Sequence, residues 1–195
     1  MTFVHKRIAA VAAVAVTAAL ALGGCAASGD SGDGGDGGEN LSVTFLPKNL
    51  GNPYFDTSSV GGAAAVAEFG GTFSEVGPAE ATPDAQVSYI NTATQQGVGA
   101  LVVSANDPEA ICDALNEARD AGVKVVTFDS DTNADCRDLF VNQADADGIA
   151  RVQVDLIAEQ IGGSGEIAIL SASANATNQN AWIEGMEAYL AEAYP

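Results

Sequence analysis

Residues 122–132 read GVKVVTFDSDT, and this stretch decides the fold class. Gly122 is typical of the residue that ends a helix. The run VKVVTF at 123–128 has the length and the β-branched composition of a buried strand. Asp129 and Asp131 follow it directly. The stretch therefore predicts the end of a helix, then a buried strand, then an acidic loop.

The same alternation of strand and helix extends along the chain from residue 41 onward. Predicted strands cover residues 41–46, 71–76, 99–103, 123–128, 139–142 and 166–170, and predicted helices cover 56–69, 85–96, 108–121, 144–161 and 179–193. Strands that are separated by single helices pair in parallel through right-handed crossovers. The fold class is therefore α/β, with an open parallel sheet that helices cover on both faces. In such sheets, ligands bind beyond the carboxyl ends of the strands.

The first 40 residues predict export. Two basic residues precede an almost unbroken apolar run at 8–22, which is shorter than the roughly 20 residues that span a membrane. Residues 1–25 are thus predicted to be a signal peptide, and its end at Cys25 resembles the bacterial lipobox, where the Cys is lipidated. An ordinary signal peptide with a chance Cys is the alternative. Residues 26–40, AASGDSGDGGDGGEN, predict a flexible tether because they contain no large apolar side chain.

Charge and histidine content exclude several function classes. The chain has 7 basic and 26 acidic residues, a net charge of −19. Loss of Lys6 and Arg7 with the signal leaves five basic residues against 26 acidic ones, a net charge of −21. Such a surface repels phosphate backbones, so we expect no nucleic-acid partner. The one His is His5, so residues 26–195 supply no His for a catalytic triad or a metal site. We expect no metal and no cofactor.

Cys112 and Cys136 remain as a pair once Cys25 is assigned to the anchor. Outside the cytoplasm, two such residues are expected to form a disulfide. Closing a loop of this length would stabilise the fold by roughly 3 kcal/mol. Two buried free thiols are the alternative.

Polar side chains follow the predicted strands at the edge where ligands bind. Their amides, carboxylates and one Lys match the donors and acceptors of sugar hydroxyls. An aromatic ring, Tyr54 or Phe55, would serve as a platform for the C–H face of a sugar. The candidate ligand-binding residues are Lys48, Asn52, Phe55, Asp129, Asp131, Asn178 and Gln179.

Structural alternatives stand beside these assignments. Lys48 could be a solvated surface charge, and Phe55 could belong to the core. Asp129 and Asp131 could cap or turn the chain. The pair at 178–179 could cap the helix that follows it.

Several short motifs, in this order and spacing, resemble a known family. They are Pro47-Lys48, GVKVVTFDSDT at 122–132, the Cys at 136, VNQ at 141–143 and TNQNAW at 177–182. Together they resemble the type I periplasmic sugar-binding proteins of ABC importers, nearest the branch of the autoinducer-2 receptor and the rhamnose-binding proteins. The resemblance covers residues 41–195. It implies two Rossmann-like lobes with parallel sheets, which close on a ligand like a hinged clam.

The resemblance also implies residue roles. In the autoinducer-2 receptor, a Lys after the first strand and an Asp that opens the DSD motif contact the ligand, and Lys48 and Asp129 match them. An Asp-Gln pair before a helix does the same, and here it is Asn178-Gln179. Because the Asp has become Asn, a plain sugar such as rhamnose stays open beside autoinducer-2. The family also pairs two Cys residues placed like those above.

The implied organisation is an N-terminal lobe at 41–138 and, at 139–195, a crossover with the start of a second lobe. The resemblance places the remainder of that lobe beyond this sequence. The expected protein is a monomeric, non-enzymatic, extracytoplasmic lipoprotein, held to the cell membrane by lipid on Cys25. It would bind a small sugar or sugar-like ligand and deliver it to the permease subunits of an ABC importer. A sensory ectodomain for a membrane signalling partner and, less favoured, a glycoside-acting enzyme are the alternatives.

Overall fold

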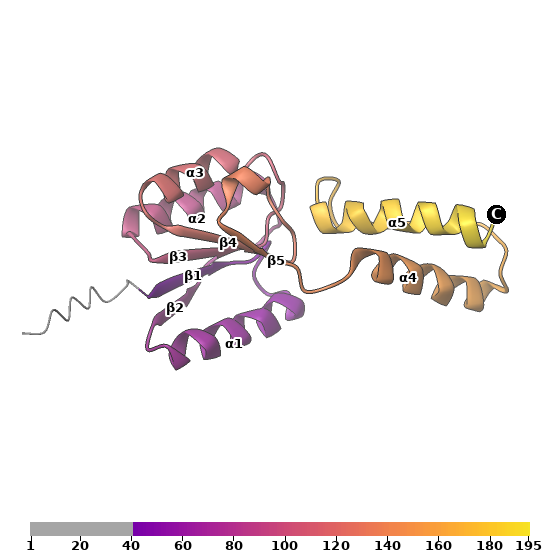
Figure 1. Cartoon of the computed structure of the whole chain (residues 1–195), viewed down its shortest axis with the longest axis horizontal. Coiled ribbons are helices and arrows are strands. Elements are labelled where there is room, and N and C mark those ends of the chain that lie inside the picture. Colours follow the sequence, from indigo (N-terminus) through magenta and orange to yellow (C-terminus); the bar gives the residue numbers. More distant parts are fainter. Residues whose placement is uncertain (1–40) are drawn as a thin grey trace, which may run out of the picture. The chain divides into compact units, whose positions relative to one another are not determined.

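The computed structural model describes residues 41–195, which contain one parallel β-sheet (Figure 1). Its strands are β1 (Ser42–Leu46), β2 (Thr72–Glu75), β3 (Ala100–Val103), β4 (Lys124–Phe128) and β5 (Leu139–Val141). They lie in the order β2-β1-β3-β4-β5, and every neighbouring pair is parallel. The predicted α/β class with a parallel sheet is confirmed.

Three helices connect the first four strands, as the alternating pattern predicts. Helix α1 (Pro53–Glu68) lies on one face of the sheet, whereas α2 (Pro83–Gln96) and α3 (Cys112–Asp120) lie on the other (Figure 1). Only a short 3₁₀ turn, η1 (Ala134–Cys136), connects β4 to β5. The strand-to-helix connections therefore bring the carboxyl ends of the strands to one edge of the sheet.

Helix α3 begins later than the predicted residue 108. The Asp107 carboxylate accepts hydrogen bonds from the backbone N–H groups of Glu109 and Ala110, both at 2.8 Å. These bonds stabilise a turn that precedes the helix. Asp107 thus caps this turn, and the regular helix starts only at Cys112.

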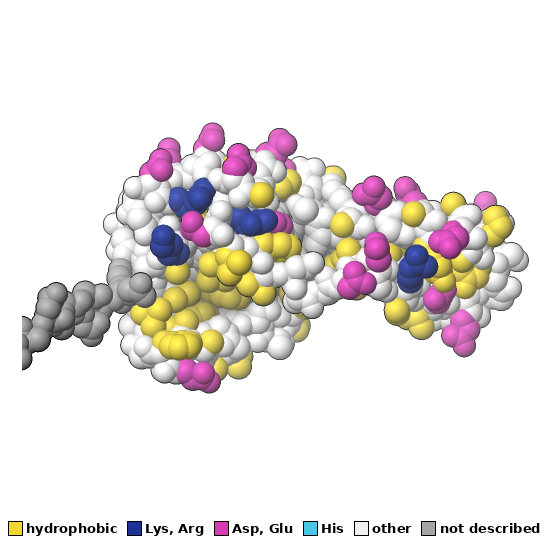
Figure 2. Space-filling model, viewed as in Figure 1, with side chains coloured by type: hydrophobic (Ala, Val, Ile, Leu, Met, Phe, Trp, Pro, Cys, Tyr) yellow, Lys and Arg dark blue, Asp and Glu magenta, His cyan; other side chains and the backbone are white. Residues whose placement is uncertain are grey.

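The main core lies between the sheet and the pair α2 and α3. Leu101 and Val103 of β3 and Val125 of β4 are fully buried there. The alternate residues Val102 and Val126 lie on the opposite face of the sheet and are only half-buried. Figure 2 shows hydrophobic side chains gathered beside α1. The prediction that helices cover both faces therefore holds fully for the face that carries α2 and α3. The other face is covered only in part, because α1 is the only helix on it within residues 41–195.

Helices α4 (Ala146–Ile161) and α5 (Thr177–Ala193) pack against each other around a small core that includes Val154 and Met186. The strand predicted at 166–170 is wrong. This segment forms no strand pairing in the described part of the chain, and Leu170 is 97% exposed. A strand requires a hydrogen-bonded neighbour, and the five described strands pair only with one another.

No helix in the described part of the chain combines the length and the hydrophobicity that a membrane crossing requires. The predicted signal peptide, the tether and the lipidation site at Cys25 fall outside the described residues.

Candidate ligand-binding site

Asp129 is the central residue of the candidate site and follows β4 directly. Its backbone φ is 58°, so it is the one non-glycine residue in the described chain with a left-handed conformation. This conformation costs an L-residue about 1–2 kcal/mol, although Asp tolerates it better than most residues. Strain of this kind is concentrated at functional sites. The strained backbone therefore marks Asp129 as a candidate functional residue.

Three side chains donate hydrogen bonds to the Asp129 carboxylate. Ser104 Oγ donates to Oδ2 at 2.7 Å, and Ser104 follows β3. Asn178 Nδ2 and Gln143 Nε2 donate to Oδ1 at 3.0 and 3.3 Å. Asp129 is only 7% exposed, and a buried carboxylate needs such donors. The residues that follow β3, β4 and β5 and the start of α5 thus meet at one carboxylate.

Lys48 supplies the positive charge of the site and follows β1. Its Nζ donates to Asn178 Oδ1 at 3.4 Å. Burial lowers the pKa of Lys48, and the negative charge of Asp129 opposes that shift. The Asn178 amide accepts from Lys48 with its oxygen and donates to Asp129 with its nitrogen. An amide therefore bridges the two charges, which a carboxylate at the same position could not do without adding a second negative charge.

Tyr54 contributes a phenol at the start of α1. Its OH accepts a hydrogen bond from Gln143 Nε2 at 2.9 Å. Burial, together with the charge of Asp129, raises the pKa of Tyr54 to about 12. The phenol is therefore a neutral donor and acceptor at physiological pH.

Ser104 and Gln143 belong to this cluster, although neither was among the residues predicted from the sequence. Ser104 directly follows β3, and Gln143 follows β5 by two residues. The position of each after a strand was the signal that could have identified them.

Two predicted residues of the α1 region have structural contacts. The Asn52 side chain caps α1 by accepting a hydrogen bond from the Tyr54 N–H at 3.1 Å. Phe55 is 4% exposed, and its ring packs edge-on against Phe128 at 6.1 Å between centroids. Direct ligand contacts by Asn52 and Phe55 stay predictions.

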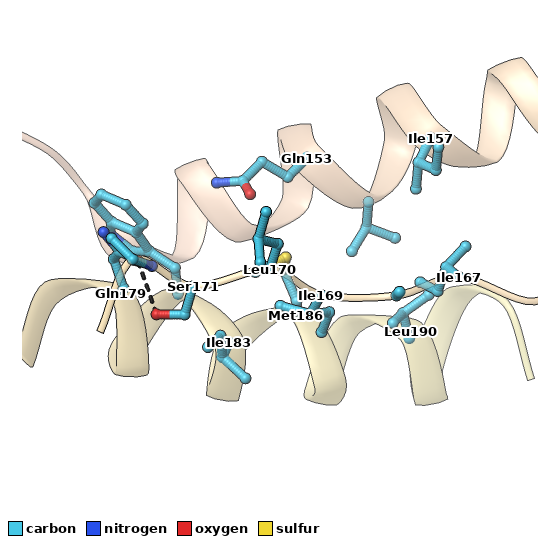
Figure 3. Close-up of a pocket in the computed structure, with 14 residues that line it drawn as sticks. Gln153, Ile157, Ile167, Ile169, Leu170, Ser171, Gln179, Ile183, Met186 and Leu190 are labelled. Atoms are coloured by element: carbon cyan, nitrogen blue, oxygen red, sulfur yellow. Dashed lines mark hydrogen bonds between the residues drawn. The ribbon is translucent and has the colours of Figure 1, made fainter. Parts of the chain in front are cut away.

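Asp131 and Gln179 have partners outside the Asp129 cluster. The Asp131 carboxylate accepts hydrogen bonds from both Nε and Nη2 of Arg137, at 2.7 and 2.8 Å. Gln179 Oε1 accepts from Ser171 Oγ at 2.8 Å, as Figure 3 shows. Figure 3 also shows the groove beside it, where Ile, Leu and Met side chains of α4, α5 and 167–170 predominate. The structure thus brings together Lys48, Asp129 and Asn178, and gives Asp131 and Gln179 other hydrogen-bond partners.

A cavity of ≈ 190 Å³ adjoins the cluster. Polar groups of Asp129, Gln143 and Asn178 line it, together with the rings of Phe140 and Trp182. Drug-sized ligands occupy cavities of about 300–1,000 Å³, so this one suits a smaller molecule. Polar groups beside aromatic rings match the hydroxyls and the C–H faces of a sugar.

The described residues offer one cluster of metal-binding side chain types, Cys112, Asp135 and Cys136. The two Cys Sγ atoms are bonded to each other, and the Cα atoms are 5.3 Å apart, within the usual range for disulfides. Because both thiols are used in this way, the cluster does not provide a metal site.

Comparison with known proteins identifies the family of this chain. Residues 43–195 match the family model of the periplasmic binding protein domain. The chain belongs to this family. The similar structures include binding proteins of ABC transporters rather than enzymes.

Three solved structures illustrate the similarity. A solute-binding protein from Clostridium phytofermentas with bound L-rhamnose has 40% identity and a TM-score of 0.76, over 78% of this chain and 48% of that one. A sugar ABC transporter protein from Actinomyces odontolyticus has 54% identity and a TM-score of 0.61, over 78% and 49%. LsrB from Clostridium saccharobutylicum in complex with AI-2 has 33% identity and a TM-score of 0.71, over 79% and 50%. The chain therefore spans about half the length of these structures.

Proposed function

We propose that this chain forms part of an extracytoplasmic receptor that binds one small, neutral, sugar-like molecule for an ABC importer. The hydrogen-bonded cluster of Lys48, Asn178 and Asp129 at the carboxyl edge of the sheet is the observation that carries this proposal. One cation and one carboxylate balance there, with an amide between them. A neutral polyol suits such a site because it needs both donors and acceptors and brings no charge of its own.

The chemistry of binding follows from the cluster. Asp129 already accepts three hydrogen bonds and would accept one more from a ligand hydroxyl, Lys48 Nζ would donate to another, and the Asn178 amide would donate to or accept from others. Hydrogen bonds to charged groups are worth about 1.5–3 kcal/mol each, roughly twice as much as those between neutral groups. The ring of Trp182 or Phe140, on the cavity wall, would pack against the C–H face.

The ligands of two similar structures define the first candidates. One of those proteins holds L-rhamnose and another holds AI-2. Both are small polyhydroxylated molecules, and the balanced charge around Asn178 favours ligands of this kind over organic acids. We therefore propose L-rhamnose and AI-2 as the first two ligands to test.

The cell-surface part of the proposal rests on the sequence. Lipid on Cys25 would hold the protein at the membrane, and residues 26–40 would give it reach toward the permease subunits. The Cys112–Cys136 disulfide would persist outside the cytoplasm. A Cys25→Ser variant would then leave the membrane fraction, whereas continued membrane retention would contradict the anchor.

Trp182 provides the test of ligand binding, because it lines the cavity beside the cluster. Its fluorescence in the complete, lipid-free protein should change and saturate on titration with L-rhamnose or AI-2. Lys48→Met should weaken the binding at least about tenfold, since a charged hydrogen-bond donor is lost. Lys124→Met is the matched control, because Lys124 is exposed at the opposite end of β4 and should leave binding unchanged. Saturable binding that is equal in both variants would contradict the proposed site.

A further inference from the structure

Asp131 uses most of its acceptor capacity within the protein. Its carboxylate accepts the two parallel hydrogen bonds from Arg137, a third from the Thr132 N–H at 2.9 Å, and a fourth from Thr127 Oγ1. Three of these donors share Oδ1, whereas Oδ2 accepts from Arg137 alone and keeps one of its two lone-pair sites. The side chains of Asp131 and Arg137 are 15% and 20% exposed, so water screens the pair only partly. Asp131 and Arg137 thus form a largely buried ion pair at the wall of the cavity.

The backbone around this pair holds the binding cluster. The Asp131 carbonyl accepts a hydrogen bond from Thr177 Oγ1 at 3.0 Å, and Thr177 precedes Asn178 at the start of α5. Asp129, with its left-handed backbone, lies two residues before Asp131. Fixing Asp131 therefore fixes both the strained turn that presents Asp129 and the contact that seats Asn178.

Arg137 connects the same pair to the aromatic wall of the cavity. Its guanidinium lies over the ring of Phe140, 5.5 Å from the centroid, and Phe140 lines the cavity. Guanidinium groups are attracted to the faces of aromatic rings at such distances. Arg137 therefore orients a carboxylate and a ring without lining the cavity itself.

We infer that Asp131 and Arg137 form a positioning pair, which sets ligand affinity by holding Asp129 and Asn178 in place. This inference rests on the proposed function. It changes the role of Asp131 from a ligand contact, as the sequence suggests, to a residue that acts through its neighbours. It also adds Arg137, which no motif singled out, to the residues that determine affinity.

The test is a double-mutant cycle on the complete, lipid-free protein. Calorimetric titrations with L-rhamnose and with AI-2 compare wild type, Asp131→Asn, Arg137→Met and the double variant. We expect each single variant to weaken binding roughly tenfold and the double variant to be no weaker than the singles, because residues in one ion pair are coupled. Arg137→Lys should lose affinity to a smaller extent, because Lys keeps the charge but not the two-pronged geometry.

A matched control separates positioning from general destabilisation. Arg119 forms an ion pair with Asp138 at 3.6 Å and does not line the cavity. Arg119→Met should therefore bind ligand as wild type does, even where its melting temperature falls. If Arg137→Met fails to fold, Arg137→Lys and Asp131→Asn decide the question.

Three results would overturn the inference. Wild-type affinity in every folded variant would show that the pair does not position the site. Additive losses, with Asp131→Asn much the larger, would show that Asp131 contacts the ligand directly. Absence of binding of either ligand by wild type would overturn the proposed function and the inference with it. This result is distinguishable from the other two because it is seen in wild type itself, whereas they are differences between wild type and the variants.

Discussion

At Asp129 the chain accepts a strained backbone in order to present a carboxylate at the edge of the sheet. Three side chains then donate to that carboxylate, and each comes from a different segment of the chain. A residue that served only to turn the chain would not need so many donors. The cost of the strain and the number of partners both favour a binding role.

Two buried serines test the hydrogen bonds around Asp129 at the residue scale. Ser104 and Ser130 are both fully buried, but only Ser104 Oγ has a partner, the Asp129 carboxylate, whereas Ser130 Oγ has none within the described chain. Ser104→Ala should lower the free energy of unfolding by about 2 kcal/mol, because a buried carboxylate loses a donor. Ser130→Ala should leave it unchanged or raise it by up to about 1 kcal/mol, because an unsatisfied hydroxyl is removed. Urea denaturation measures both, and equal losses in the two variants would contradict the assigned hydrogen bonds.

The phenol of Tyr54 predicts a pH dependence. Its pKa is raised from 10.0 to about 12, first by burial and then by the charge of Asp129. The phenol therefore stabilises the fold fully below pH 10, and this contribution is lost as the pH rises through about 12. The tyrosinate absorbance of wild type minus that of Tyr54→Phe should give a midpoint near 12. Asp129→Asn should move this midpoint down, and a wild-type midpoint of 10 would show that Tyr54 does not face the carboxylate.

At the scale of elements, Asn52 illustrates how one residue can be assigned to two roles. Its side chain caps α1 through the Tyr54 N–H. Asn52→Ala should therefore lower the free energy of unfolding by about 1 kcal/mol, while Asn52→Ser should retain most of the stability. Chemical denaturation gives these values, and ligand titration of the same variants shows whether Asn52 also contacts the ligand. Equal stability of Asn52→Ala and wild type would exclude the cap.

The disulfide between Cys112 of α3 and Cys136 of η1 predicts a further effect on the stability of the fold. Cys112 and Cys136 are 24 residues apart in the sequence. A loop of that length restricts the unfolded chain, so Cys112→Ala with Cys136→Ala should cost roughly 3 kcal/mol. Thermal denaturation with and without reductant should show the same loss in wild type and no reductant effect in the double variant. A melting temperature that does not respond to reductant in wild type would contradict the disulfide.

The sequence predicted the elements well where the pattern alone determines them. The apolar runs with intervening helices specify parallel pairing, because each strand finds its neighbours through the crossovers. The segment at 166–170 has a strand-like composition, yet a strand also depends on a partner, which the composition of one segment does not reveal. Similarly, the late start of α3 depends on the turn that the Asp107 side chain stabilises.

The site was predictable to the extent that strand ends determine it. Lys48 and Asp129 follow from topology, whereas Asn178 lies at the start of α5 and was assigned through the family resemblance; the structure brings the three together. The partner of Asp131 was not predictable, because the guanidinium of Arg137 reaches the Asp131 carboxylate only when the loop after β4 and η1 have folded. Residue type and position identify which side chains gather at the edge, whereas the direction of each depends on its local hydrogen bonds.

At the scale of the whole molecule, the described chain combines a sheet with a separate pair of helices, α4 and α5. Hydrogen bonds connect the residues that follow the strands to the start of α5. The chain spans about half the length of the similar structures, so ligand affinity belongs to the complete protein. The residues named above are the ligand contacts that we propose for this half.

Isothermal titration calorimetry of the complete, lipid-free protein with L-rhamnose and with AI-2 tests the proposed binding site most directly. We expect one site per molecule for at least one of the two ligands, with affinity lost in Lys48→Met and in Asp129→Asn and retained in Lys124→Met. No heat with either ligand in a folded protein, or binding that survives in both site variants, would contradict the proposed site.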